Sequence, residues 1–187
     1  MLNLVHILTA TLALSAGVVG ITIPANQTEG VYTVTTGADG QDVFVRIGDI
    51  TPGPLTEAAA ISGPGRLGRR ATTWPQKTNP ICPEARYLKH YDFYDGGAWQ
   101  GFYSSCQSVG DTRFKNGKAV YAFWGGAVAY MCSYQSNPCN VQEWVDAVNW
   151  VQNSCRGVDG PYFAPGYLSI PAWKKAYGYA NSETSFC

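Results

Sequence analysis

Several carboxylates in the second part of the chain have the spacing or setting for acid–base chemistry. Glu143 and Asp146 are three residues apart in a segment with helical periodicity, so their side chains share one helix face. Paired carboxylates beside aromatic side chains are the machinery of a glycoside hydrolase. The alternative is a solvated helix face, where the helix dipole favours acids near the N-terminus. We favour this second interpretation. The full set of candidate acids is Asp92, Asp95, Glu143, Asp146 and Asp159.

His90 is the only histidine after Arg70, and this limits the chemistry further. One histidine excludes a two-histidine ribonuclease mechanism. It also argues against a Ser-His-Asp or Cys-His nucleophile, because the cysteines are expected to form disulfides. A general-base pair of His90 with Asp92 stays open, although we prefer a capping or surface histidine. We therefore predict that the protein is not an enzyme and that it uses no cofactor.

All six cysteines also follow Arg70, in a chain that we expect to be exported. An even number of cysteines in such a chain predicts three disulfides. Sequence alone does not choose among the pairings; short spacing favours Cys132 with Cys139, and the other four cysteines then share two bonds. A zinc site is the rival interpretation, but no Cys-x-x-Cys pair is present, and we expect no metal. The predicted disulfide cysteines are Cys82, Cys106, Cys132, Cys139, Cys155 and Cys187.

Aromatic residues give the strongest compositional signal. The chain has 6 Trp, 12 Tyr and 7 Phe, and every Trp follows Arg70. Some of these rings must form the core, and exposed Tyr and Trp are typical of surfaces that bind proteins or sugars. Core packing of the C-terminal segment is the alternative. The candidate binding surface consists of Trp150, Trp173, Lys174, Lys175, Tyr177 and Tyr179.

A strand, a turn and a helix position most of these residues. The apolar run AVAYM at residues 127–131 is typical of a strand buried on both faces, and KAVYAF at 118–123 is a second strand in a hairpin closed by Gly125-Gly126. From Asn140 the apolar spacing becomes helical, with Asn140 as N-cap and Glu143 three residues later. We predict helices near residues 93–105 and 141–154.

The remaining C-terminal segments are shorter. YLSI at 167–170 is a predicted strand, and Pro171 is expected to open a short helix over AWKKAYG. Together these elements predict an α+β fold, a disulfide-stapled α/β sandwich. It has an antiparallel sheet of three to five strands packed against two main helices.

The first 20 residues predict a secretory signal peptide. They form an apolar run from the initiator Met, interrupted by polar residues and ending in small ones. No other run is long enough to span a bilayer, so we expect a secreted, extracellular protein without stable membrane insertion. The formal net charge is +0 and no basic stripe is evident, so we expect no nucleic-acid partner. We expect a monomer.

Residues 21–70 differ from the rest because they contain no Cys and no Trp. They include a glycosylation sequon at Asn26 and a predicted hairpin around Asp39-Gly40. A Pro/Gly/Ala-rich linker then ends in Arg69-Arg70, which is similar to the dibasic sites cut by kexin-type proteases. We predict a prosegment at 21–70 and a mature six-cysteine domain at 71–187; an uncut linker is the alternative.

The order of signal peptide, cysteine-free prosegment and aromatic six-cysteine domain resembles fungal small secreted proteins of the effector type. AYMCSYQSNPCNVQEWVDAVNWVQNSC and IPAWKKAYGYANSETSFC resemble the core of one such group. Residues 118–160 are also similar to the killer toxin of smut fungi and its relatives. That resemblance implies an α/β sandwich with two antiparallel helices on an antiparallel sheet, secretion, an antagonist or host-directed role, and no enzymatic activity. The smut toxin has more cysteines, so neither its disulfides nor its toxic lysine carries over to a residue here.

Three functions follow as hypotheses. The first is a secreted fungal effector, associated with virulence, that binds a host protein or glycan. The second is a killer-toxin-like antimicrobial protein acting on competing fungi, although neutral charge argues against simple membrane lysis. The third is a small cell-wall hydrolase that uses the acids named above.

Overall fold

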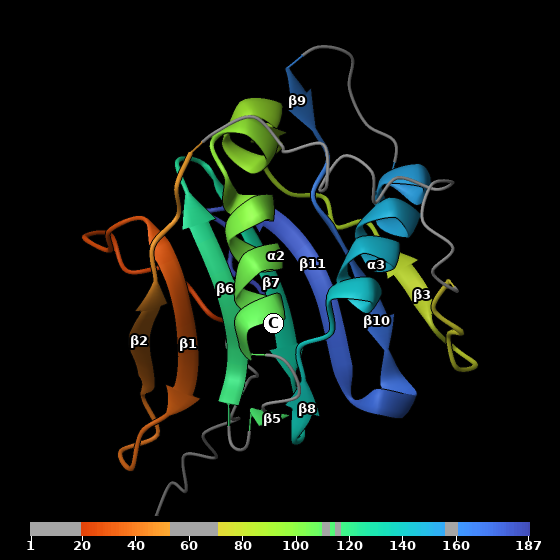
Figure 1. The fold of residues 1–187 in the computed structure, drawn as a ribbon, viewed down its shortest axis with the longest axis horizontal. Coiled ribbons are helices and arrows are strands. Elements are labelled where there is room, and N and C mark those ends of the chain that lie inside the picture. Colours follow the sequence, from red (N-terminus) through yellow and green to blue (C-terminus); the bar gives the residue numbers. More distant parts are fainter. Residues whose placement is uncertain (1–19, 53–70, 110–112, 115–116, 156–160) are drawn as a thin grey trace, which may run out of the picture.

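The protein is an α+β structure in which two helices cover one face of a large antiparallel sheet (Figure 1). The computed structural model describes residues 20–52, 71–109, 113–114, 117–155 and 161–187. The sheet has seven strands in the order β2-β1-β6-β7-β11-β10-β3, and every neighbouring pair is antiparallel. The strands are β1 (Gly30–Thr36), β2 (Asp42–Gly48), β3 (Asn79–Ile81), β6 (Gly117–Trp124), β7 (Ala127–Ser133), β10 (Gly166–Ile170) and β11 (Lys175–Asn181).

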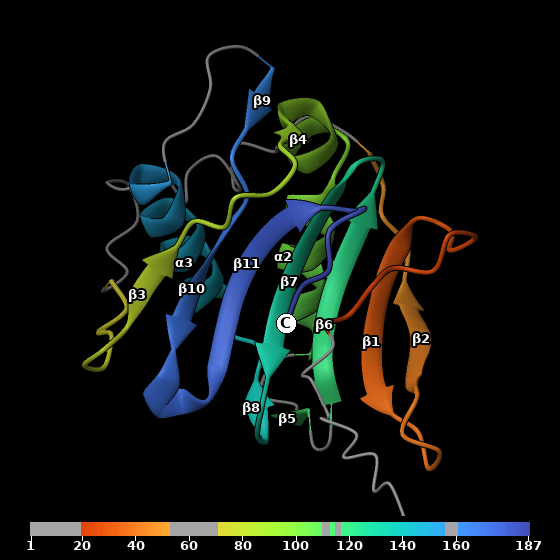
Figure 2. The ribbon, with the colours of Figure 1, turned by 180° about the vertical axis from the view of Figure 1, so that it is seen from behind.

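The smaller elements lie around this sheet. The helices are α2 (Ala98–Val109) and α3 (Val141–Ser154), and a π-helical turn (Tyr91–Asp95) precedes α2. Two small ladders join β4 (Leu88–Lys89) to β9 (Tyr162–Phe163) and β5 (Arg113–Phe114) to β8 (Asn137–Pro138). Seen from behind, the sheet is covered by neither of the described α-helices, and the chain after β11 crosses this open face to its C-terminus (Figure 2).

Strand β7 is the centre of the molecule, and each of its side chains is buried. Alternate residues point to opposite faces of a strand. Ala127, Ala129 and Met131 therefore join the core layer under the helices, whereas Val128, Tyr130 and Cys132 join a second layer on the open face. The prediction that residues 127–131 form a strand covered on both faces is confirmed.

Local sequence signals placed several elements correctly. The hairpin β6–β7 closes at Gly125-Gly126, and β1–β2 closes around Asp39-Gly40. Helix α3 begins where predicted, because the Asn140 side chain accepts a hydrogen bond from the Glu143 amide at 3.0 Å. Helix α2 starts later than predicted, after the π-helical turn and Gly97.

The predicted helix after Pro171 is wrong. Only Pro171–Trp173 forms a 3₁₀ turn, and Lys174 in the left-handed conformation (φ 48°) then redirects the chain into β11. Strand β11 pairs with β7 on one side and β10 on the other. Helical propensity in seven residues is a weak preference, and two ladders of backbone hydrogen bonds override it.

The predicted strand number, three to five, is too low. Residues 30–48 contribute β1 and β2 to the main sheet rather than forming a separate hairpin, and residues 175–181 contribute β11. Strand β1 pairs with β6 from Gly30 opposite Phe123 to Thr35 opposite Gly117. The predicted prosegment therefore forms one side of the sheet in the uncut chain. Arg69, Arg70 and residues 1–19 lie outside the described residues.

Three disulfides are present, as the cysteine count predicts, but the favoured pairing is wrong. The bonds are Cys82–Cys155, Cys106–Cys139 and Cys132–Cys187. Cys132 and Cys139 do not pair because they belong to different layers. Cys132 lies on the open face of the sheet, and Cys139 lies in the core beneath the helices. Within the described residues no helix is long and apolar enough to cross a membrane.

Buried tyrosines should make the fold sensitive to alkali. Burial is the main cause that raises the pKa of Tyr130, Tyr177 and Tyr179 above the ordinary value of 10.0. In the unfolded chain these hydroxyls ionise at about pH 10, whereas the folded chain keeps them protonated. The free energy of unfolding therefore keeps its full value below about pH 10. It falls as the pH rises above about 10, because ionisation of these hydroxyls favours the unfolded chain.

We expect the melting temperature to drop steadily as the pH rises from about 10 to about 11.5. Part of the tyrosinate absorbance should appear only together with the loss of the circular dichroism of the fold. Complete tyrosinate formation in a chain that is still folded would contradict this expectation.

Candidate functional site

The carboxylates proposed for acid–base chemistry make structural contacts. The Asp92 Oδ2 accepts a hydrogen bond from the Gly126 amide at 2.9 Å, and the Glu29 carboxylate accepts one from the Gly125 amide at 2.9 Å. Both acids therefore hold the β6–β7 turn. The general-base pair of His90 with Asp92 has no support in these contacts. Asp95 lies at the end of the π-helical turn, and Asp159 lies outside the described residues.

Glu143 belongs to a buried charge network at the start of α3. Its Oε2 lies 2.8 Å from the Lys175 Nζ and accepts a hydrogen bond from the Tyr177 hydroxyl at 3.0 Å. The Lys175 ammonium also donates to the Pro138 carbonyl at 2.9 Å. The Lys175 side chain is 2% exposed and that of Glu143 is 17% exposed. Burial, and then the Glu143 charge, raise the pKa of Tyr177. The network ties α3 to β11 and β8.

Asp146 points to a different partner from Glu143, although the two are neighbours along the helix. Its carboxylate accepts hydrogen bonds from the Thr72 amide at 2.7 Å and from the Gln142 side chain at 2.8 Å. Asp146 thus fastens the chain that follows residue 70 onto α3. Glu143 and Asp146 thus bind different partners, and the described contacts do not bring the two carboxylates together as a catalytic pair.

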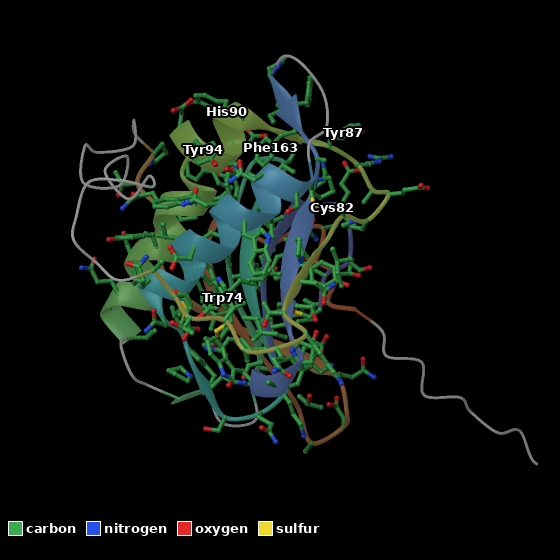
Figure 3. The ribbon with its side chains drawn as sticks, turned by 90° about the vertical axis from the view of Figure 1, so that its right-hand side faces the viewer. Trp74, Cys82, Tyr87, His90, Tyr94 and Phe163 are labelled. Atoms are coloured by element: carbon green, nitrogen blue, oxygen red, sulfur yellow. A yellow bond between two sulfur atoms is a disulfide. The ribbon has the colours of Figure 1, made fainter. Side chains whose placement is uncertain are left out.

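His90 is exposed and stands beside an aromatic group at one end of the molecule. Its ring lies 4.6 Å from that of Tyr94, whose hydroxyl accepts a hydrogen bond from Gln152. Phe163 packs against both rings, and Figure 3 shows the three side chains together, away from Trp74. Burial raises the pKa of Tyr94. Among the described residues, no three His, Cys, Asp or Glu side chains are grouped as a metal site.

The predicted binding surface divides into exposed and buried residues. Trp150 and Trp173 are half-buried and both contact Trp74, with ring centroids 6.3 and 5.8 Å apart. Lys174 is exposed beside them. The other three predicted residues, Lys175, Tyr177 and Tyr179, point under the helices and are at most 3% exposed. They contribute to the core, so the surface reduces to a tryptophan cluster of Trp74, Trp150 and Trp173 with Lys174. Asn26 is exposed in a turn, and its glycosylation stays a prediction.

The open face of the sheet has a groove of about 290 Å³ that sequence reasoning missed. Its floor is β11, which lines it on this face with the small side chains of Ala176 and Ala180. Tyrosines from β7 and β10 stand on both sides of the Gly178 position. A Cβ on Gly178 would lie 2.5 Å from the Tyr167 Cβ and 2.6 Å from the Tyr130 ring, so only glycine fits here. The aromatic groove is lined by Tyr130, Tyr134, Tyr167, Phe186, Pro83 and Pro165.

The aromatic groove offers ring faces rather than charged groups to a ligand. Burial, and then the neighbouring Tyr167 and Tyr134, raise the pKa of Tyr130, which is 4% exposed. Burial and Tyr167 also raise the pKa of Tyr134, which is 56% exposed and whose hydroxyl donates a hydrogen bond to the Cys187 carbonyl at 3.5 Å. Exposed aromatic rings are suited to contact a sugar ring or an extended peptide.

A signal for the groove is present in the sequence. In KAYGYAN, residues 175–181, large and small side chains alternate strictly. For a strand this alternation places Lys175, Tyr177 and Tyr179 on one face and small residues on the other. The alternation was not recognised because the predicted helix AWKKAYG overlaps this segment.

No protein-family model, curated protein or solved structure matches this chain.

The buried pair of Lys175 and Glu143 gives a stability prediction. Lys175→Met leaves the Glu143 carboxylate without its cation, and breaking such a pair costs about 3–5 kcal/mol. Lys174→Met is the matched control, because Lys174 is the exposed neighbour and its loss should change stability by about 0.5 kcal/mol or less. Urea unfolding measures both variants. Equal midpoints for the two would contradict the structural role of the network.

Proposed function

We propose that this protein is a secreted, non-enzymatic fungal effector that acts by binding a host protein or glycan. The observation that carries the proposal is the aromatic groove on the open face, which is lined by tyrosine and phenylalanine rings and includes the exposed Tyr134. The acids that the hydrolase alternative would use, Asp92, Glu143 and Asp146, accept structural hydrogen bonds, and this argues against that alternative.

The dimensions of the groove limit what can bind. A volume of about 290 Å³ lies at the small end of ligand pockets, so it admits one sugar ring or one or two side chains of an extended peptide. Such a site recognises a repeating unit or a short motif of a larger target. The half-buried tryptophan cluster lies on the helix side of the sheet, away from the groove, and is a separate candidate for target binding. The proposal does not depend on it.

The test is complementation of a deletion strain during host colonisation. Loss of the ring faces in a Tyr134→Ala/Tyr167→Ala variant should remove most of the colonisation that the wild-type gene restores. The matched control is Tyr91→Ala, since Tyr91 is 61% exposed and does not line the groove. Both variants must be secreted in equal amounts and show the same melting temperature as wild type.

Normal colonisation by the folded double variant would refute the role of the groove. Pull-down with purified wild-type protein on chitin, β-glucan and host extracellular proteins distinguishes a glycan from a protein target. Growth inhibition of other fungi by the purified protein, without any host, would instead favour the killer-toxin-like alternative.

A further inference from the structure

The N-terminal segment, residues 20–52, is built into the fold like any interior part of the sheet. Strand β1 pairs with β6 from Gly30 to Thr35, with one register shift after Val34. Val31 and Val34 are 3% and 0% exposed, one in each core layer. Ile21 forms an antiparallel bridge with Phe186, with N···O distances of 2.7 and 3.0 Å. The start of the segment and its central strand are therefore anchored.

Polar contacts at several points add to this packing. The Tyr121 hydroxyl donates to the Gln27 side chain at 2.8 Å, and the Lys118 ammonium lies 2.5 Å from the Asp42 carboxylate. The Tyr32 ring stacks on that of Tyr121 with centroids 5.4 Å apart. Each contact joins the segment to β6, so the segment and β6 form one continuous interface.

Helix α2 also has a surface shaped for this segment. A Cβ on Gly101 would lie 2.6 Å from the Ile50 Cγ1, so the glycine lets the Ile50 side chain approach the helix closely. Ile50 packs on the main core cluster. On the other side of the linker, the Thr72 amide is held by Asp146. The chain is thus fixed on both sides of residues 53–70, before and after the predicted cut.

Apart from Lys118 and the register shift beside it, strand β6 lacks the features that protect a natural sheet edge. Edge strands carry charges, prolines or bulges that discourage pairing with other chains. In β6, Val120, Tyr121 and Ala122 are completely buried, and the charge of Lys118 is paired with Asp42 in the segment itself. Loss of the segment would expose the edge of β6 with its apolar stretch at residues 120–122, which favours aggregation.

From these contacts we infer that residues 20–52 stay bound to residues 71–187 after the linker is cut, so that the processed protein consists of two chains. The segment contains no cysteine, whereas all three disulfides lie within 71–187. The two chains are therefore joined by strand pairing and packing, without a covalent bond. The surface formed by β6, α2 and Phe186 is an interaction site whose partner is the chain's own N-terminal segment.

The test uses the purified full-length chain cut with a kexin-type protease. A second version, with a site for a sequence-specific protease in place of residues 65–70, ensures a single cut in the linker. We expect one species that contains both peptides in native mass spectrometry and gel filtration. Denaturing electrophoresis without reductant should separate the two peptides. A released N-terminal peptide with a monomeric 71–187 chain of unchanged circular dichroism and melting temperature would overturn the inference.

A matched pair of valine variants makes the interface itself measurable. Val34→Ala removes two buried methyl groups from β1 and should raise the dissociation constant of the cut protein about tenfold or more. Val45→Ala makes the same change in β2, where Val45 is 49% exposed, and should leave the constant nearly unchanged. Dilution of the cut proteins followed by gel filtration measures both. Equal constants for Val34→Ala and Val45→Ala would show that β1 does not hold the two chains together.

Discussion

The structure depends on the complete burial of β7 between two apolar layers. A buried strand must satisfy its backbone groups through its neighbours, since an unpaired amide or carbonyl in a core is costly. Here β6 and β11 supply those partners, and neither neighbour follows from β7 alone. Because side chains alternate along β7, each face needs a cover of its own. The helices cover one face, and the two ends of the chain cover part of the other.

The two faces are stabilised in different ways. Under the helices, packing is reinforced by the buried pair of Lys175 with Glu143 and by the Cys106–Cys139 bond. On the open face, rings take the place of a helix: Phe186 packs between Tyr121 and Tyr130, with centroids 5.4 and 4.7 Å away. On β11 this layer is reduced to Ala176 and Ala180, and the candidate groove lies there beside Tyr130 and Tyr167.

The covalent and non-covalent connections are also distributed unequally. Each disulfide joins residues far apart in sequence, by 73, 33 and 55 positions, and such long loops give the largest entropic stabilisation. All of them lie after residue 70. The N-terminal segment is held without a disulfide, by β1–β6 pairing, the Ile21 bridge, packing and polar contacts such as Lys118 with Asp42. A cut in the linker would therefore leave a disulfide-bonded body and a segment that is held on it only by non-covalent contacts.

The sequence by itself determined the elements whose signals are local. Asn140 and Glu143 set the start of α3, Gly125-Gly126 and Asp39-Gly40 set two hairpins, and the cysteine count set the number of disulfides. The tertiary structure decided which distant segments meet: β1 beside β6, β11 between β7 and β10, and Cys132 with Cys187. It also decided that Glu143 binds Lys175 and that Tyr177 faces the core. Caps, turns and periodicity act within about a dozen residues, whereas strand order and the choice of face depend on contacts across the whole chain.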